Sequence, residues 1–359
     1  EARLRLARGK PDEAIDLLQG VLKDEPQMAS GHHYLGLAYV QKNDVPQARR
    51  ELTEAVRLAP NVGEIRTALA SLHLSEGSHD LAVEQAQAAL RLNGRNLQAA
   101  TILGDAYLGK GDLTKAKQTF EAISKAIPNE PLSRYRLGLI ARSEKDDAKA
   151  LAYFEEALTI NPHIIEPLDQ IAAVKVSQGK AKEARDRVMR QFELSPKSPM
   201  IQNLLGKLWM HEKDAGQAEA AFKKAIELNP ELPLSYMNLG QLYLATGKQD
   251  QAMKEYEAAL AKNPKLVGAH MILGMIHEQR KEYDKAKARY EQALKINPKF
   301  GPAANNLAWI LNEENGNLDL ALSYAQTARE QLPNDPNIAD TLGWIYYKKN
   351  AFLTATSLL

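Results

Sequence analysis

Apolar residues recur at the spacing i, i+3, i+4 and i+7 along two neighbouring stretches of the chain, LSYMNLGQLYLAT at 234–246 and QAMKEYEAALAK at 251–262. This spacing places the apolar side chains on one face of an α-helix. The segment GKQD lies between the two stretches, and we expect Gly247 to end the first helix and Asp250 to cap the second. The pattern therefore predicts a pair of helices joined by a tight turn.

The helical pair returns at a fixed interval along the chain. Pro264 follows the second helix, where it disfavours helical geometry at Asn263 and supplies a fixed φ for the next start. Steps of 34 residues from Pro264 reach a proline at every position but one, in the series Pro26, Pro60, Gly94, Pro128, Pro162, Pro196, Pro230 and Pro298. The sequence is thus predicted to be an array of helical hairpins.

Small residues follow the same register. Alanine occurs every 34 residues at Ala14, Ala48, Ala82, Ala116, Ala150, Ala184, Ala218, Ala252 and Ala286, and the series continues at Ala321 and Ala355 after one inserted residue in the ENGN turn near Asn315. A Leu-Gly pair marks most first helices, with the glycine at Gly36, Gly104, Gly138, Gly206, Gly240, Gly274 and Gly343. Only small residues fit where two helices cross closely, so each hairpin is expected to contain such a crossing.

Taken together, these residues resemble the signature of a known repeat family. A 34-residue helix–turn–helix with Leu-Gly, an aromatic residue three positions later, then alanine, an aromatic residue, alanine and proline resembles the tetratricopeptide repeat, over essentially the whole chain. The resemblance implies an all-α fold, an α-solenoid in which stacked hairpins wind into a right-handed superhelix with the first helices lining a concave groove. We expect a single array over 1–359, with a partial repeat at 1–28, nine repeats at 29–335 and a truncated repeat at 336–359. Each hairpin has too little apolar surface to fold alone, so neighbours must stack.

Charge and composition exclude several classes of partner. The chain has 46 Lys and Arg against 45 Asp and Glu, mixed along its length, so no basic block recruits nucleic acid or anionic lipid by its field. It has no cysteine, and no apolar run approaches the roughly 20 residues that span a bilayer. We therefore expect no nucleic-acid partner and no membrane insertion by this chain.

Motifs of catalysis are also missing from the sequence. There is no HExxH, no GxSxG and no cysteine nucleophile, and the GKGD at 109–112 falls on a turn between helices. His270 and His277 lie two helical turns apart, which favours helix packing over a metal site. The sequence predicts no catalytic residue, no metal and no cofactor, and hence a protein that is not an enzyme.

The most informative residues lie on the first helices of repeats six to nine, away from the Leu-Gly-aromatic stripe. Methionines adapt to apolar partners and amides can bond a peptide backbone, so these residues are predicted to form a peptide-binding groove. The predicted set is Met200, Asn203, Lys207, Met237, Asn238, Gln241, Met271, Met275, Asn305, Asn306 and Trp309. The alternative is that the methionines fill packing gaps between adjacent helices.

Resemblance to subgroups of the family limits the kinds of partner that we expect. The residues at the positions of a carboxylate clamp for chaperone tails include His33, Leu37, Glu64, Ala68 and Ser71, which cannot clamp a carboxylate. The closing segment NNLAWILNEENGNLDLALSYAQTARE, followed by ADTLGWIYYKKNAF, resembles the last repeats of long bacterial tetratricopeptide proteins of exopolysaccharide export and exosortase systems. That resemblance favours a bacterial origin and an extracytoplasmic site over a cytoplasmic one.

Two functions stay open from the sequence. The first is a non-enzymatic scaffold that holds a protein or peptide partner in its groove, within a bacterial envelope or export assembly. The second is the substrate-recruiting region of a larger enzyme such as a glycosyltransferase. Phe352, Leu353 and Leu358 are expected to present apolar faces that no following repeat covers, which predicts self-association through this end.

Overall fold

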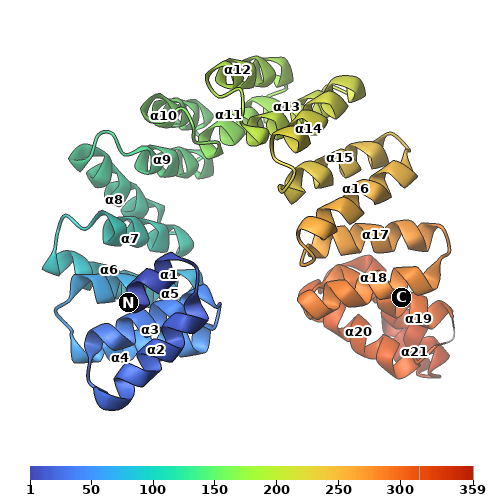
Figure 1. Cartoon of the computed structure of the whole chain (residues 1–359). Coiled ribbons are helices and arrows are strands. Elements are labelled where there is room, and N and C mark those ends of the chain that lie inside the picture. Colours follow the sequence, from blue (N-terminus) through green and yellow to red (C-terminus); the bar gives the residue numbers. More distant parts are fainter. Residues whose placement is uncertain (315, 359) are drawn as a thin grey trace. The chain divides into compact units, whose positions relative to one another are not determined.

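A computed structural model describes residues 1–314 and 316–358, and its regular elements over these ranges are helices, with no strand. The predicted all-α fold is therefore confirmed. The chain divides into two compact units, Glu1–Val174 and Lys175–Leu359 (Figure 1). The inserted residue predicted near Asn315 and the last residue of the truncated repeat, Leu359, lie outside the described residues.

The first unit is built from consecutive helical hairpins. Its helices are α1 (Ala2–Ala7), α2 (Pro11–Asp24), α3 (Ala29–Gln41), α4 (Val45–Leu58), α5 (Gly63–Ser75), α6 (His79–Leu92), α7 (Leu97–Gly109), α8 (Leu113–Ala126), α9 (Pro131–Ser143) and α10 (Asp147–Ile160), and the boundary between the units falls within α11 (Glu166–Ser177). Each helix packs on its neighbour in the chain, as in α3 with α4 and α6 with α7.

The second unit continues the same plan. Its helices are α12 (Ala181–Leu194), α13 (Pro199–His211), α14 (Ala215–Leu228), α15 (Pro233–Ala245), α16 (Gln249–Lys262), α17 (Val267–Gln279), α18 (Tyr283–Ile296), α19 (Gly301–Glu313), α20 (Leu318–Gln331), α21 (Pro336–Lys348) and α22 (Phe352–Leu358). Within this unit α13 packs on α15 and α19 on α21, so first helices lie side by side.

The turn between α15 and α16 differs in one detail from the sequence prediction. Gly247 has φ of 74°, a left-handed conformation that favours glycine, and it follows the end of α15 as predicted. Asp250 is not the cap of α16, because the helix begins at Gln249 and Lys248 is its N-cap. The carboxylate of Asp250 instead accepts a hydrogen bond from Arg280 (2.8 Å) on the next repeat. This aspartate links neighbouring repeats and does not start a helix.

The close helix crossings are present in each unit. The alanines of the 34-residue series from Ala14 to Ala321 are fully buried, and Ala355 is 2% exposed. A methyl group added at Gly206 would lie 2.3 Å from the Phe222 ring, and one at Gly274 would lie 2.4 Å from the Tyr290 ring. At these crossings the glycine of the first helix therefore receives the aromatic ring of the second helix, and a larger residue would force the two helices apart.

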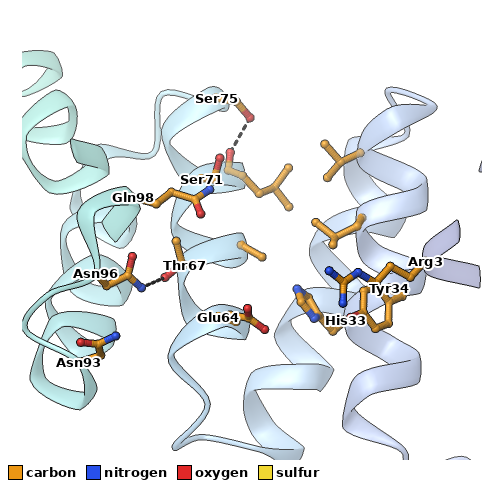
Figure 2. A pocket seen from close by; sticks show the side chains of 14 residues that line it. Arg3, His33, Tyr34, Glu64, Thr67, Ser71, Ser75, Asn93, Asn96 and Gln98 are labelled. Atoms are coloured by element: carbon orange, nitrogen blue, oxygen red, sulfur yellow. Dashed lines mark hydrogen bonds between the residues drawn. The ribbon is translucent and has the colours of Figure 1, made fainter. Parts of the chain in front are cut away.

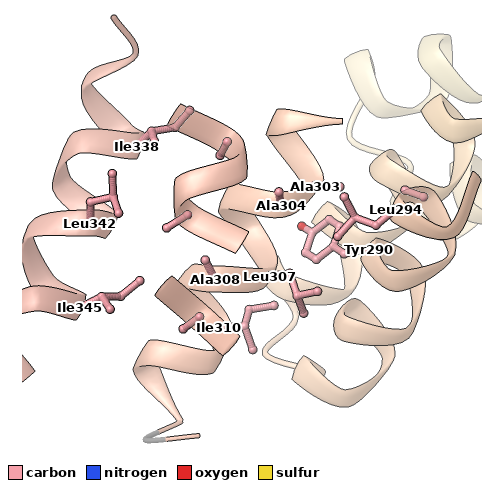
Figure 3. Close-up of a cluster of buried hydrophobic side chains, with 14 of the residues drawn as sticks. Tyr290, Leu294, Ala303, Ala304, Leu307, Ala308, Ile310, Ile338, Leu342 and Ile345 are labelled. Atoms are coloured by element: carbon pink, nitrogen blue, oxygen red, sulfur yellow. The ribbon is translucent and has the colours of Figure 1, made fainter. Parts of the chain in front are cut away.

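Buried apolar side chains run through each unit as a chain of linked clusters. Figure 3 shows one of them in the second unit, where Tyr290 and Leu294 of α18 meet Leu307 of α19, and Leu342 of α21 packs on the other side. Each cluster draws residues from at least two successive hairpins, so no hairpin holds its own core. This is the stacking that the repeat pattern predicts.

Candidate functional site

The predicted groove residues lie on α13, α15, α17 and α19, and the structure separates them by exposure. Lys207, Gln241 and Met275 are exposed, and Met275 is 50% exposed. Six others are partly exposed, namely Met200, Met237, Met271, Asn305, Asn306 and Trp309. Asn203 and Asn238 are buried, at 2% and 5% exposure.

Asn203 and Asn238 form a hydrogen-bond network inside the second unit. The amide nitrogen of Asn203 donates to Ser235 Oγ (2.8 Å) and to the Pro199 carbonyl (3.0 Å). The amide nitrogen of Asn238 in turn donates to Asn203 Oδ1 (2.9 Å). These bonds tie α13 to α15. The structure therefore places both amides in helix packing, where they do not face a partner's backbone.

Asn306 belongs to a second network at the end of α17. Its amide nitrogen donates to the Tyr290 hydroxyl (3.1 Å), and that hydroxyl donates to Glu278 Oε2 (2.5 Å). Burial raises the pKa of the Tyr290 hydroxyl well above its ordinary value, so the phenol stays protonated. The network fixes the side chains of Glu278 and Asn306 next to each other.

The methionines divide between packing and exposure. Met237 packs against the cluster around Leu239 and Tyr243, and Met271 packs against the cluster around Leu307. For these two the packing interpretation, left open by the sequence, agrees with the contacts. Met275 lies on the same helix as Met271 but is half exposed, so its side chain is available to another molecule.

Met275 borders a pocket on the first-helix face of the second unit. The pocket has a volume of about 460 Å³ and is lined by Leu244, Ile272, Met275, Ile276, Glu278, Gln279, Asn306 and Trp309. The Trp309 ring forms one wall and is held edge-on against Tyr283, with the ring centroids 6.2 Å apart. The site is therefore an apolar hollow with one carboxylate, Glu278, and two amides, Gln279 and Asn306, at its side, on three successive first helices.

Two aromatic residues extend this surface and were missed in the sequence. Trp344 and Tyr347 of α21 are 49% and 52% exposed, and their rings contact each other edge-on at 5.7 Å. Trp344 follows the glycine of its Leu-Gly pair, as Met275 does on α17. This shared position, directly after the glycine, is the sequence feature from which Trp344 could have been predicted. We call Met275, Trp309, Trp344 and Tyr347 the exposed stripe.

The first unit has a different surface on its first helices. A pocket of about 640 Å³ is lined by side chains of α3, α5 and α7, with Arg3 from α1 (Figure 2). Figure 2 shows Thr67 bonded to Asn96, whose amide nitrogen donates to the Thr67 hydroxyl (3.0 Å). Burial lowers the pKa of His33 on its wall, which favours the neutral imidazole. The lining of this pocket carries polar and apolar side chains in similar proportion, and its aromatic residues are His33 and Tyr34.

The two histidines considered for metal binding are used in packing. His270 Nε2 donates to the Pro264 carbonyl (3.1 Å), and His277 Nδ1 lies 2.7 Å from Glu282 Oε2. Over residues 1–314 and 316–358, no group of three or more His, Asp or Glu side chains is placed to hold a metal ion. None of the helices described there is long and apolar enough to cross a bilayer.

The exposed apolar residues of α22 are relevant to the predicted self-association. Phe352 is 52% exposed and Leu353 is 90% exposed, and the Phe352 ring contacts Tyr347 edge-on at 5.6 Å. Exposed apolar patches favour association. We expect the chain to dimerise or form larger species as its concentration rises, and the variant Leu353→Asp to shift light-scattering masses towards the monomer. Equal masses for the two proteins across the dilution series would contradict the prediction.

Comparison with protein families gives a consistent result. One model of the tetratricopeptide repeat matches residues 5–72, 210–275 and 278–345. A second model of the same repeat matches 67–131, 103–163 and 171–233. The matches fall in both units and cover more than half of the chain.

Individual proteins with similar sequences are parts of assemblies by name. The type IV pilus assembly protein PilF of Pseudomonas aeruginosa is 27% identical over 147 residues, which is 39% of this chain and 56% of that protein. The anaphase-promoting complex subunit cut9 of Schizosaccharomyces pombe is 22% identical over 217 residues, or 58% of this chain and 32% of that protein. The chain thus spans about half or less of the length of these relatives.

Solved structures give the same fold. The crystal structure of yeast Tom70 superimposes with a TM-score of 0.55 at 16% sequence identity, over 99% of this chain and 89% of that one. At this identity the likeness concerns the fold alone.

Proposed function

Because this chain belongs to the tetratricopeptide repeat family, we propose that it is a non-enzymatic scaffold that binds a segment of a partner protein on the first-helix face of its second unit. The observation that carries the proposal is the exposed stripe with the pocket beside it. Met275, Trp344 and Tyr347 are each about half exposed, although most large apolar residues of this unit are buried or partly buried. Exposed large apolar side chains gathered on the first helices are typical of interaction sites.

The chemistry of the surface defines the partner segment. Met275, Trp309 and Trp344 stand on successive first helices, so their spacing suits apolar side chains spaced along an extended or helical peptide. Tryptophan, tyrosine and methionine are enriched at protein interfaces. The two aromatic residues bury large areas at low entropic cost, and methionine adapts its shape to the partner. Since the contacts are mainly apolar, the affinity is expected to change little with salt.

The assembly proposed for the scaffold is a bacterial envelope or export complex. Support comes from PilF, a bacterial relative whose name places it in pilus assembly, and from the resemblance of the closing repeats to those of bacterial export proteins. Membership of an assembly agrees with a surface made for a polypeptide. The particular export system, the extracytoplasmic site and the right-handed superhelix stay predictions.

The experiment begins with a pull-down by the purified chain, identification of the bound protein and calorimetric titration of the segment it contributes. Met275→Ala and Trp309→Ala should each lower affinity by roughly 1–2 kcal/mol, or about 5- to 30-fold, the range for anchors of a recognition surface. Met189→Ala is the matched control, because Met189 of α12 is 47% exposed in the same unit but lies on a second helix. Equal losses in Met275→Ala and Met189→Ala would refute the proposed site.

A further inference from the structure

The fourth residue of several first helices fills a slot within its own hairpin. In α15 the hydroxyl of Tyr236 donates to the Pro230 carbonyl (3.1 Å), six residues earlier in the chain. His270 of α17 makes the same bond to Pro264 (3.1 Å), and Arg66 of α5 makes it to Pro60 (2.6 Å). The slot thus takes a side chain that brings a hydrogen-bond donor to a carbonyl in the preceding turn.

The hairpin of α7 and α8 lacks this side chain. Its fourth residue is Ala100, and Gly94 stands where the other turns have proline. A pocket of about 870 Å³ is found here, lined by Leu90, Gly94, Arg95, Asn96, Leu97, Ala100, Leu103, Gln118, Thr119, Ala122, Ile123, Ala126 and Ile127. No described side chain donates to the Gly94 carbonyl. The pocket is therefore the same slot without its occupant.

Another hairpin also has alanine in this position, but it carries a larger residue on its second helix. Ala304 is the fourth residue of α19, and it is fully buried. Tyr324 of α20 packs against the cluster that contains Ala304. The corresponding residue of α8, three positions after its anchor alanine, is Thr119, which is too short to fill the space. The α7–α8 pocket therefore results from two small residues in the same place.

Charge and polarity at the pocket point to one kind of occupant. Arg95 lines it, and its guanidinium forms no ion pair with another described residue. Ile127, which also lines the pocket, is 39% exposed. We propose that this slot binds the tyrosine side chain of a protein segment that carries an acidic residue next to that tyrosine. The ring takes the place of Tyr236 in the related hairpin, its hydroxyl donates to the Gly94 carbonyl, and the neighbouring carboxylate pairs with Arg95.

This site lies in the first unit and shares no residue with the exposed stripe. Its occupancy does not require the proposed function of the second unit, and the two are tested separately.

The test titrates the full chain with the blocked dipeptide N-acetyl-tyrosyl-glutamate amide. Binding is monitored through the NMR signals of the backbone amides. We expect saturable binding in the millimolar range with shifts at Ala100 and Thr119. The phenylalanine analogue should bind about 5-fold more weakly, because it lacks the hydroxyl donor. The glutamine analogue should bind about 2- to 5-fold more weakly, as for loss of one exposed ion pair. Absence of saturable binding, or equal binding of the phenylalanine analogue, would overturn the proposal.

Variants of the chain test whether the dipeptide binds in the α7–α8 pocket. Ala100→Tyr fills the slot from within and should abolish binding, whereas Ala148→Tyr, at an exposed position of α10, should leave it unchanged. If Ala100→Tyr does not fold, Arg95→Gln gives a second result. It should remove the preference for the glutamate probe over the glutamine probe and leave the affinity for the glutamine probe as it is. Unchanged preference in Arg95→Gln would overturn the proposal.

Discussion

The variant Ala252→Phe is expected to lose about 1–3 kcal/mol of unfolding free energy, because overpacking a tight crossing strains both helices. Ala252 is fully buried, and it packs in one cluster with Tyr243 of its partner helix α15 and with Tyr256 one turn further along α16. No space exists there for a phenyl ring. Since contacts in a repeat array are mostly between neighbours, the damage should be local.

Hydrogen exchange measures where the damage falls. Exchange should accelerate first in residues 233–298, the repeat of Ala252 and the one that follows. The matched control is Ala261→Phe, which makes the same substitution at an exposed position of the same helix and should leave the exchange rates unaltered. Unchanged exchange over 233–298 in Ala252→Phe would mean that the crossing is not close.

The second large effect is expected at Asn203, as a loss of stability. Asn203→Ala removes the acceptor of Asn238 and the donor to Ser235, and it leaves polar groups buried at the contact of α13 with α15. Such a loss costs about 1–3 kcal/mol. The thermal midpoint should fall, while the affinity for a partner held by the exposed stripe should be unchanged in the protein that stays folded.

The control for Asn203 is Gln241→Ala, at an exposed amide on α15 that was placed in the same predicted groove. Its thermal midpoint should match that of the parent protein. If Asn203→Ala instead lowered partner affinity with an unchanged midpoint, the buried network would be part of the binding surface after all.

Most of the fold follows from the 34-residue period. The stretch 251–262 was predicted as a helix and forms α16 (Gln249–Lys262). The anchor alanines are buried because the crossing leaves no room for larger side chains. The predicted N-cap of α16 was wrong, because Asp250 accepts a hydrogen bond from Arg280 of the next repeat. Such a contact between repeats cannot be predicted from the local sequence.

The site was less predictable for a geometric reason. Successive residues of a helix point 100° apart, so one first helix presents some side chains to the open face and some to the adjacent first helix. Asn238 and Gln241 are on the same helix, yet the first is buried against α13 and the second is exposed. Sequence alone does not place the neighbouring helix. Trp344 becomes recognisable as a residue of the exposed stripe only when the position directly after the small residue is compared across the first helices.

The central claim is that a partner segment lies on the exposed stripe, and cross-linking tests it most directly. A photoreactive benzoylphenylalanine at Gln241 of α15, beside the pocket residue Leu244, should capture the partner found in the pull-down. The same group at Met189 of α12 should not, although both positions are exposed. Mass spectrometry of the adduct identifies the segment bound. Capture from Met189 with none from Gln241 would contradict the claim and place the partner on the second helices.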